Sequence, residues 1–272
     1  MEKIKLNNTT FIVFLRIDNE ERLSNIIAMT TFYRQNIENP KFIFIEDTPN
    51  VMHCKEVDPQ QGDQYFGYIN KDQWKKSYGY NIGITNAQTE ILCFNDVDCI
   101  VHPEQLLETE KRLLANPNFG LLYPYDGRFL CALKSLKSRF IAAGHDINVL
   151  LSEQPDKNSP VGYQTENVLV GHTNSRGGIV MARKDNIIKC NGYNPKFKGW
   201  SYEDSEIPVR VMKLGYDVAL LNIGPLWHLH HFNNKSSRKE TQPYYENNRA
   251  IANYVDNATS DEIREYIKTW NI

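Results

Sequence analysis

Residues 91–99 read Ile-Leu-Cys-Phe-Asn-Asp-Val-Asp-Cys, an apolar run that ends in two carboxylates. A short apolar run followed at once by acidic residues is typical of a buried strand that ends at the edge of a sheet. Residues i and i+2 of a strand face the same side, so Asp96 and Asp98 are placed to bind one cation together. The alternative is a strand that simply continues into a polar loop, and this segment alone does not decide between the two.

The chain upstream of this strand predicts parallel pairing. Strands are expected at residues 11–15 and 41–45, joined by a helix over residues 20–37 whose apolar residues form one stripe. Such a βαβ unit implies a parallel sheet. The carboxyl ends of its strands, at Arg16 and at Asp47, should lie side by side where open α/β sheets bind ligands.

Downstream of residue 70 the pattern continues to mix helices and strands. Helices are expected at residues 75–87, 103–115, 130–151, 184–190 and from Glu203 to Gly215, strands at 121–125, 177–181 and 217–223, and a polar loop at 152–172. Thr259 and Glu262 have the spacing of a capping box within a polar C-terminal tail. The fold class predicted is α/β, with a mixed central sheet flanked by helices.

Composition excludes several classes of protein. The 272 residues carry a net charge of −2, so no general basic field attracts nucleic acid. No apolar stretch approaches the roughly 18 residues that a transmembrane segment needs, and the start of the chain lacks a signal-peptide core. The five cysteines are scattered and never in CxxC spacing, which favours reduced thiols in a cytoplasmic protein over disulfides or a zinc site.

A histidine cluster follows late in the chain, at residues 228–231. His228 and His230 are expected to face one side of a short strand, with His231 on the other. Carboxylate and imidazole ligands together suit Mn²⁺ or a similar ion better than Ca²⁺. The alternative is a histidine packed in the core beside Trp227. No glycine-rich dinucleotide or P-loop motif is present, so a bound diphosphate would need a divalent cation.

A second acidic pair, Glu203-Asp204, begins a predicted helix. Acidic residues are stabilising at a helix N-terminus, by about 0.3–1 kcal/mol, which is a sufficient structural explanation. The functional alternative is a general base that takes a proton from a hydroxyl group. Trp200, which follows Gly199, is either a core residue or an aromatic ring suited to stacking on a sugar.

Taken in order, these motifs resemble the metal-dependent glycosyltransferases of the GT-A fold, most nearly the inverting β-1,4-galactosyltransferases and bacterial capsule or lipooligosaccharide enzymes. The resemblance covers most of residues 10–231. It rests on Phe14-Leu15-Arg16, Lys75-Lys76 with Asn81 and Gly83, the DxD motif Asp96-Val97-Asp98, Gly177-Gly178, Gly199-Trp200-x-x-Glu203-Asp204 and His228-x-His230. One departure is Ser201, where the family has a second glycine.

The resemblance implies a single Rossmann-like GT-A domain over residues 1–272. Residues 1–100 would bind the nucleotide-sugar, residues 101–231 the acceptor, and residues 232–272 would form the tail. The implied reaction moves a hexose or N-acetylhexosamine, galactose-type favoured, from a UDP-sugar to a saccharide or lipid-linked saccharide, with inversion and with Mn²⁺ or another divalent cation. Surface polysaccharide or glycan synthesis would be its setting, in the cytoplasm or at the inner face of the membrane as a peripheral protein.

The resemblance also implies a role for individual residues. Asp204 would be the base, Glu203 and Trp200 would contact the acceptor, and the metal ligands would be Asp98, His228 and His230. The donor would be bound by Arg16, Asp47, Lys76, Asn81, Asp96, Gly178 and Trp200.

Three alternatives remain open from the sequence. A retaining transferase on the same fold would not use Asp204 as a base. A nucleotidyltransferase shares the βαβ start, but it usually carries a glycine-rich basic loop, and residues 15–22 contain no glycine. A non-catalytic sugar-binding domain would need neither the metal ligands nor the base.

Overall fold

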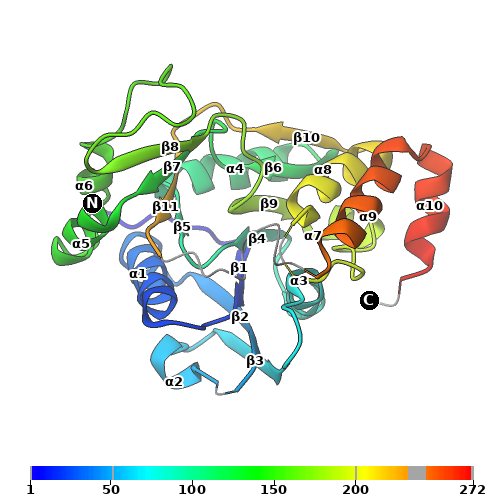
Figure 1. Ribbon diagram of the computed structural model, residues 1–272, viewed down its shortest axis with the longest axis horizontal. Helices are drawn as coiled ribbons and strands as arrows, with labels where there is room; N and C mark the ends of the chain where they lie inside the picture. The colour runs from blue at the N-terminus through cyan, green and yellow to red at the C-terminus, as the bar shows by residue number, and fades with distance from the viewer. Residues whose placement is uncertain (1, 51, 200, 232–242, 271–272) are drawn as a thin grey trace.

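The apolar runs that the sequence predicts as strands form the centre of a seven-stranded mixed sheet (Figure 1). In the computed structural model, which describes residues 2–50, 52–199, 201–231 and 243–270, the strand order is β10-β6-β9-β4-β1-β2-β3. The strands are β1 (Thr9–Leu15), β2 (Lys41–Thr48), β3 (Gln64–Ile69), β4 (Ile91–Asn95), β6 (Phe119–Tyr123), β9 (Ile179–Arg183) and β10 (Asp217–Leu220). The mixed sheet flanked by helices is therefore confirmed.

Parallel pairing joins β1 to β2 and to β4, as the βαβ pattern predicts. β3 pairs with β2 in parallel and forms one edge of the sheet. β9 runs antiparallel between β4 and β6, so strands from the two halves of the chain share one sheet. The carboxyl ends of β1 and β4 therefore lie beside the start of β9, and the side chains that follow them meet at one edge.

A second, four-stranded sheet has the order β5-β11-β7-β8. Its strands are β5 (Cys99–Ile100), β11 (Leu226–Leu229), β7 (Phe129–Ala132) and β8 (Val168–His172). Because β5 follows the DxD motif directly, this sheet brings His228 of β11 beside that motif. Residues from both sheets belong to one hydrophobic core, including Phe94, Met181 and Trp227.

Helices surround the two sheets. They are α1 (Glu20–Asn36), α2 (Cys54–Val57), α3 (Lys76–Asn86), α4 (Pro103–Ala115), α5 (Lys134–Ala142), α6 (Ile147–Leu151), α7 (Lys184–Lys189), α8 (Glu203–Lys213), α9 (Tyr245–Asn257) and α10 (Ser260–Lys268). In Figure 1, α9 and α10 pack beside α8, at the far end of the molecule from α5 and α6. No helix among the described residues has both the length and the apolarity needed to cross a bilayer.

Two sequence predictions about secondary structure are wrong. The helix expected over residues 130–151 does not begin at residue 130, because residues 130–132 belong to β7, which pairs with β11 and β8. Residues 168–172 were expected in a loop, yet they form β8. Both strands are short and only partly buried, so neither has the continuous apolar run of β1 or β4, and their pairing depends on partners far away in the sequence. The capping box of Thr259 and Glu262 is confirmed.

Close contact between α3 and β1 gives a test of the fold. Gly83 faces β1, and a Cβ atom added there would fall against the side chain of Ile12. We expect Gly83→Ala to lower the free energy of unfolding by about 1–3 kcal/mol, because overpacking outweighs the higher helix propensity of alanine. Urea denaturation measures this change. A variant as stable as wild type would contradict the close packing of α3 on the sheet.

Candidate active site

A cavity of about 340 Å³ opens where β1 and β4 end. Phe14 and Trp74 also line it, and Phe14 belongs to the segment at the end of β1 that the sequence singled out. Its wall brings together most of the predicted site residues, which are Arg16, Lys76, Asp96, Asp98, Gly178, Glu203, Asp204 and His228. Motifs that lie more than a hundred residues apart in the chain therefore form one site.

Lys76 lies at the centre of the charged groups. It is the first residue of α3, and its Nζ is 2.9 Å from Asp96 Oδ1, 3.5 Å from Asp204 Oδ1 and 3.8 Å from Glu203 Oε1. Burial opposes the charge of Lys76, but Asp204 and then Asp96 outweigh this effect and hold its pKa well above the usual value. The lysine thus links the DxD motif to the second acidic pair.

The two carboxylates of the DxD motif point to different partners. β4 ends at Asn95, and Asp96 and Asp98 lie in a turn, so the side-by-side placement expected from strand geometry does not hold. Asp96 accepts a hydrogen bond from the hydroxyl of Tyr80 (3.1 Å) and pairs with Lys76. Of these two carboxylates, Asp98 alone belongs to a group of described residues that could hold a metal ion.

That group consists of Asp98, His228 and His231. Oδ2 of Asp98 is 3.5 Å from Nε2 of His228 and 3.1 Å from Nε2 of His231, and the three ligand atoms lie within 4.8 Å of one another. Burial raises the pKa of Asp98, but His228 and His231 hold it well below its usual range. Burial likewise opposes the charge of His228, yet Asp98 raises its pKa to about 10.

The structure corrects the placement of His230. β11 ends at Leu229, so the alternation of a strand does not continue to His230, and its Nδ1 lies 3.8 Å from Oε2 of Glu21. The carbonyl of His230 accepts a hydrogen bond from Lys137. His231, which the sequence pattern placed on the opposite side, is the residue that meets Asp98 and His228.

The glycine pair at the start of β9 allows close approach on both sides. A Cβ atom on Gly177 would lie 3.0 Å from Oδ2 of Asp204. Gly178 has a φ of +84°, and a Cβ atom there would lie 2.9 Å from Sγ of Cys99. The carbonyl of Gly178 accepts a hydrogen bond from the backbone N–H of Asp96 (2.8 Å). Glycine at both positions therefore lets Asp204 and the DxD turn pack against the same strand.

A strained turn presents the second acidic pair. Ser201 has φ +119° and Tyr202 has φ +68°, which are values that favour glycine and are costly for other residues. Ser201 therefore has a glycine-like backbone conformation where the family has its second glycine. Trp200, predicted to contact donor and acceptor, lies outside the described residues.

Glu203 and Asp204 differ in their surroundings. The side chain of Glu203 is 9% exposed, and its Oε2 has no hydrogen-bond partner among the described residues, whereas Asp204 is 39% exposed. Burial, followed by the charge of Asp204, raises the pKa of Glu203 to about 7. Near neutral pH the pair therefore offers one carboxyl that readily keeps a proton beside a more accessible carboxylate.

Two predicted donor-binding residues lie behind the cavity. Asp47 is fully buried and accepts hydrogen bonds from Arg16 Nη1 (3.0 Å), Asn70 Nδ2 (3.0 Å) and the backbone N–H of Lys75 (2.9 Å). Asp47 thus orients Arg16 toward the cavity. Asn81 exchanges two hydrogen bonds with the backbone of Tyr193 (2.8 and 2.7 Å). Neither side chain lines the cavity.

Sequence reasoning did not identify Tyr80 as a site residue, or His231 as a member of the metal group. Tyr80 is four residues after Lys76 on α3, so helical spacing places it on the same face, and that signal could have found it. His231 could be found only by knowing that β11 ends at Leu229.

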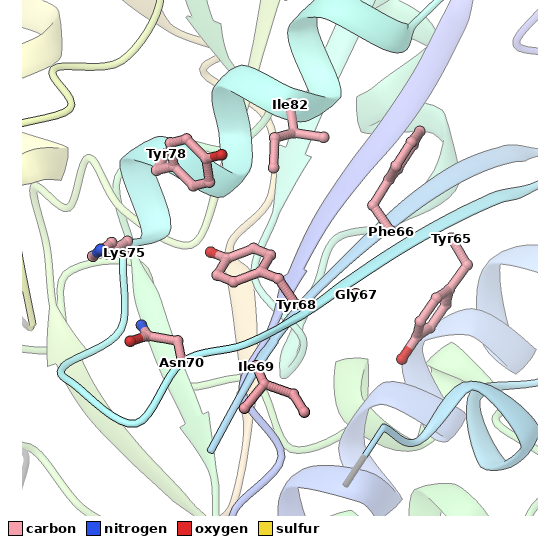
Figure 2. A pocket seen from close by; sticks show the side chains of 9 residues that line it. All are labelled: Tyr65, Phe66, Gly67, Tyr68, Ile69, Asn70, Lys75, Tyr78 and Ile82. Carbon is pink, nitrogen blue, oxygen red and sulfur yellow. The ribbon is translucent and has the colours of Figure 1, made fainter. Parts of the chain in front are cut away.

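A larger cavity, of about 690 Å³, lies at the outer edge of the sheet between β3 and α3 (Figure 2). Its lining includes Tyr65, Tyr68 and Tyr78 together with Asn70 and Lys75. The described residues that line it include no carboxylate and no imidazole, so this cavity offers neither a carboxylate or histidine base nor a metal group. The smaller cavity is the candidate active site.

Comparisons with known proteins bear on the fold and the class of this chain. Residues 167–232 match a family model described as the N-terminal domain of galactosyltransferase, and this segment contains Gly177, Gly178, Glu203, Asp204 and His228. The catalytic domain of Drosophila β1,4-galactosyltransferase 7, solved in complex with xylobiose, matches with a TM-score of 0.50 and 18% sequence identity, over 95% of this chain and 83% of that chain. No curated protein sequence matches significantly.

The resemblance drawn from the sequence is therefore confirmed at the level of fold and class. The fold is that of a GT-A galactosyltransferase catalytic domain. Together with this fold, the match of the segment that carries the acidic pair and the histidines supports a galactosyltransferase-like glycosyltransferase.

The buried hydrogen bonds of Asn81 predict a structural role. Asn81→Ala would leave the N–H and C=O of Tyr193 without partners, so we expect the free energy of unfolding to fall by about 2–4 kcal/mol. Nucleotide affinity of the folded variant should stay unchanged, with the exposed Gln88→Ala as a control for both measurements. Loss of nucleotide binding at unchanged stability would instead support a direct donor contact.

The raised pKa of Glu203 predicts a dependence of stability on pH. The folded state binds the proton of Glu203 more tightly than the unfolded chain does. The contribution of Glu203 to the free energy of unfolding therefore falls as pH rises from about 4.5 through about 7. Glu203→Gln cannot ionise, so its free energy of unfolding relative to wild type should be more favourable at pH 8 than at pH 5, by roughly 1 kcal/mol or more. Denaturant titrations at the two pH values measure this; an equal difference at both would contradict the shift.

Proposed function

We propose that the chain is an inverting glycosyltransferase that moves a hexose or N-acetylhexosamine, galactose-type favoured, from a UDP-sugar to a saccharide or lipid-linked saccharide hydroxyl. The observation that carries this proposal is the position of Asp204. It lines the cavity that holds the metal group, and it also lines a second cavity of about 410 Å³. A carboxylate at such a junction can serve as a base between a donor and an acceptor.

The donor side combines a metal group with two cations. Asp98, His228 and His231 converge, and a carboxylate with two imidazoles fits Mn²⁺. A divalent cation held there would neutralise the diphosphate of the donor and of the departing UDP. Arg16, oriented by Asp47, supplies a guanidinium group to the same cavity. Lys76 would add a second positive charge opposite the diphosphate, on the side of the cavity where Asp96 lies.

The acceptor side supplies the base. Asp204 would take the proton of the attacking hydroxyl as it bonds to the anomeric carbon, and Glu203 would hydrogen-bond to the acceptor. Nζ of Lys76 lies 3.5 Å from Oδ1 of Asp204 and would orient this carboxylate. Attack from the side opposite the diphosphate inverts the anomeric configuration. A base in this position supports inversion over retention.

The setting of the reaction belongs to the same proposal. The cysteines are free thiols, which supports a cytoplasmic location, and the enzyme would act in surface polysaccharide or glycan synthesis. A sugar-binding domain without catalysis remains the second candidate. The convergence of a base, a metal group and two cations at one cavity favours the enzyme.

Metal-dependent nucleotide binding is the first expected outcome. UDP at about 100 times its dissociation constant should stabilise the wild-type protein by about 2.7 kcal/mol in the presence of Mn²⁺ and not with a chelator. Asp98→Ala should abolish this stabilisation because the carboxylate of the metal group is lost. A thermal-shift titration measures both. Stabilisation by UDP that is equal with and without Mn²⁺ would contradict the role of this group.

If Asp204 is the base, its substitution should reduce sugar transfer without weakening nucleotide binding. Asp204→Asn should bind UDP with Mn²⁺ as wild type does, yet lose roughly 10²–10⁴-fold in kcat for sugar transfer, because the amide cannot accept the proton. Asp217→Asn, on β10, is a matched control that lies outside both cavities. NMR of the product gives the anomeric configuration. Transfer at the wild-type rate, or a retained configuration, would show that Asp204 is not the base.

A further inference from the structure

The second cavity beside Asp204 carries a cation that the proposed reaction does not use. Arg176 lies in the loop between β8 and β9, directly before Gly177, and lines this cavity with His172, Tyr202 and Tyr245. Glu203 and Asp204 form the shared wall with the donor cavity. An acceptor whose hydroxyl reaches Asp204 therefore extends toward Arg176.

Arg176 is unusual among the arginines of this chain. Of the arginines that the structure describes, it alone forms no ion pair with a carboxylate within 4 Å. The paired ones are Arg16, Arg22, Arg34, Arg112, Arg128, Arg139, Arg183, Arg210, Arg249 and Arg264. A guanidinium left without a carboxylate at the wall of a substrate cavity can bind an anion of the substrate with two parallel hydrogen bonds.

The backbone on each side of Arg176 is held in place. The N–H of Ser175 donates to the carbonyl of Gly127 (2.9 Å), and the carbonyl of Gly177 accepts from the hydroxyl of Tyr125 (2.7 Å). The side chain of Arg176 is exposed, while the chain from which it projects is anchored twice. Such anchoring reduces the entropy lost when the guanidinium binds a ligand.

The neighbouring acidic residues do not neutralise the positive charge of Arg176. Glu203 and Asp204 are both within 4 Å of Lys76, which offsets their charge from the donor side. Burial, then Asp204, raises the pKa of Tyr123, whereas Arg176 lowers it, so Asp204 and Arg176 both lie close enough to act on this residue. The cavity wall thus carries two carboxyl groups that already contact Lys76 and, at Arg176, a guanidinium group without a carboxylate partner among the described residues.

We infer that the acceptor of this enzyme is an anionic saccharide, and that Arg176 recognises its carboxylate or phosphate group. This inference rests on the proposed function, since it assigns the cavity to the acceptor. The aromatic rings of Tyr202 and Tyr245, with centroids 5.4 Å apart, line the same cavity and offer an apolar surface for the sugar ring. Arg176 is a specificity-determining residue that takes no part in proton transfer.

The test compares related glucose derivatives with and without an anionic group. With UDP and Mn²⁺ saturating the donor side, isothermal titration calorimetry measures the affinity of methyl β-glucuronide, methyl β-glucoside and glucose 6-phosphate. We expect at least one of the two anions to bind about tenfold or more tightly than the glucoside, with an advantage that shrinks at high salt. The glucuronide and the phosphate distinguish a uronic acid from a phosphorylated sugar.

Variants assign the effect to Arg176. Arg176→Gln should reduce the affinity for the preferred anion to that for the glucoside, and Arg176→Lys should restore it in part. Arg249→Gln removes the same charge from α9, close enough to act on Tyr202 but outside the cavity lining, and should change nothing. Equal affinity for all three sugars, no measurable binding of either anion, or an unchanged preference in Arg176→Gln would overturn the inference.

This outcome is separable from the proposed function. Arg176→Gln should show the same Mn²⁺-dependent stabilisation by UDP as wild type, because Arg176 does not line the donor cavity. If UDP binds and the sugars are not discriminated, only the anionic acceptor fails. If UDP does not stabilise the wild-type protein, the transferase proposal itself fails.

Discussion

The ion cluster around Lys76 is the interaction on which the site depends. One ammonium group at the start of α3 lies within 4 Å of Asp96, Glu203 and Asp204, which belong to motifs more than a hundred residues apart. Without Lys76, three carboxylates would face one another at the edge of the sheet, and like charges in a partly buried site repel strongly. The lysine therefore makes it possible for the DxD turn and the start of α8 to meet.

In this arrangement the two carboxylates of the DxD motif contact different groups. Asp96 is engaged by Lys76 and Tyr80 on the side of the large sheet. Asp98 turns toward the small sheet, where pairing of β11 with β5 places His228 beside it. The group Asp98, His228 and His231 thus forms where the two sheets meet, and the acidic pair Glu203-Asp204 lies where α8 meets α3. Gly177 allows the two parts to approach, because a side chain there would crowd Asp204.

Sequence reasoning could predict what depends on local pattern. The βαβ start, the bounds of α4 and the capping box of α10 follow from apolar periodicity, proline and capping chemistry, and each is confirmed. The choice of His231 over His230 depends on where β11 ends, and the strand at residues 129–132 depends on partners far away in sequence. Asn81 was singled out by resemblance, whereas its hydrogen bonds to Tyr193 are a tertiary feature that no local pattern encodes.

The most direct test of this account is a crystal structure of the protein with Mn²⁺ and UDP, with the metal located from its anomalous scattering. The account predicts one Mn²⁺ bound by Asp98, His228 and His231, with the diphosphate of UDP on the same ion and facing Arg16. Mn²⁺ bound elsewhere, or UDP bound away from the cavity that these residues line, would contradict it.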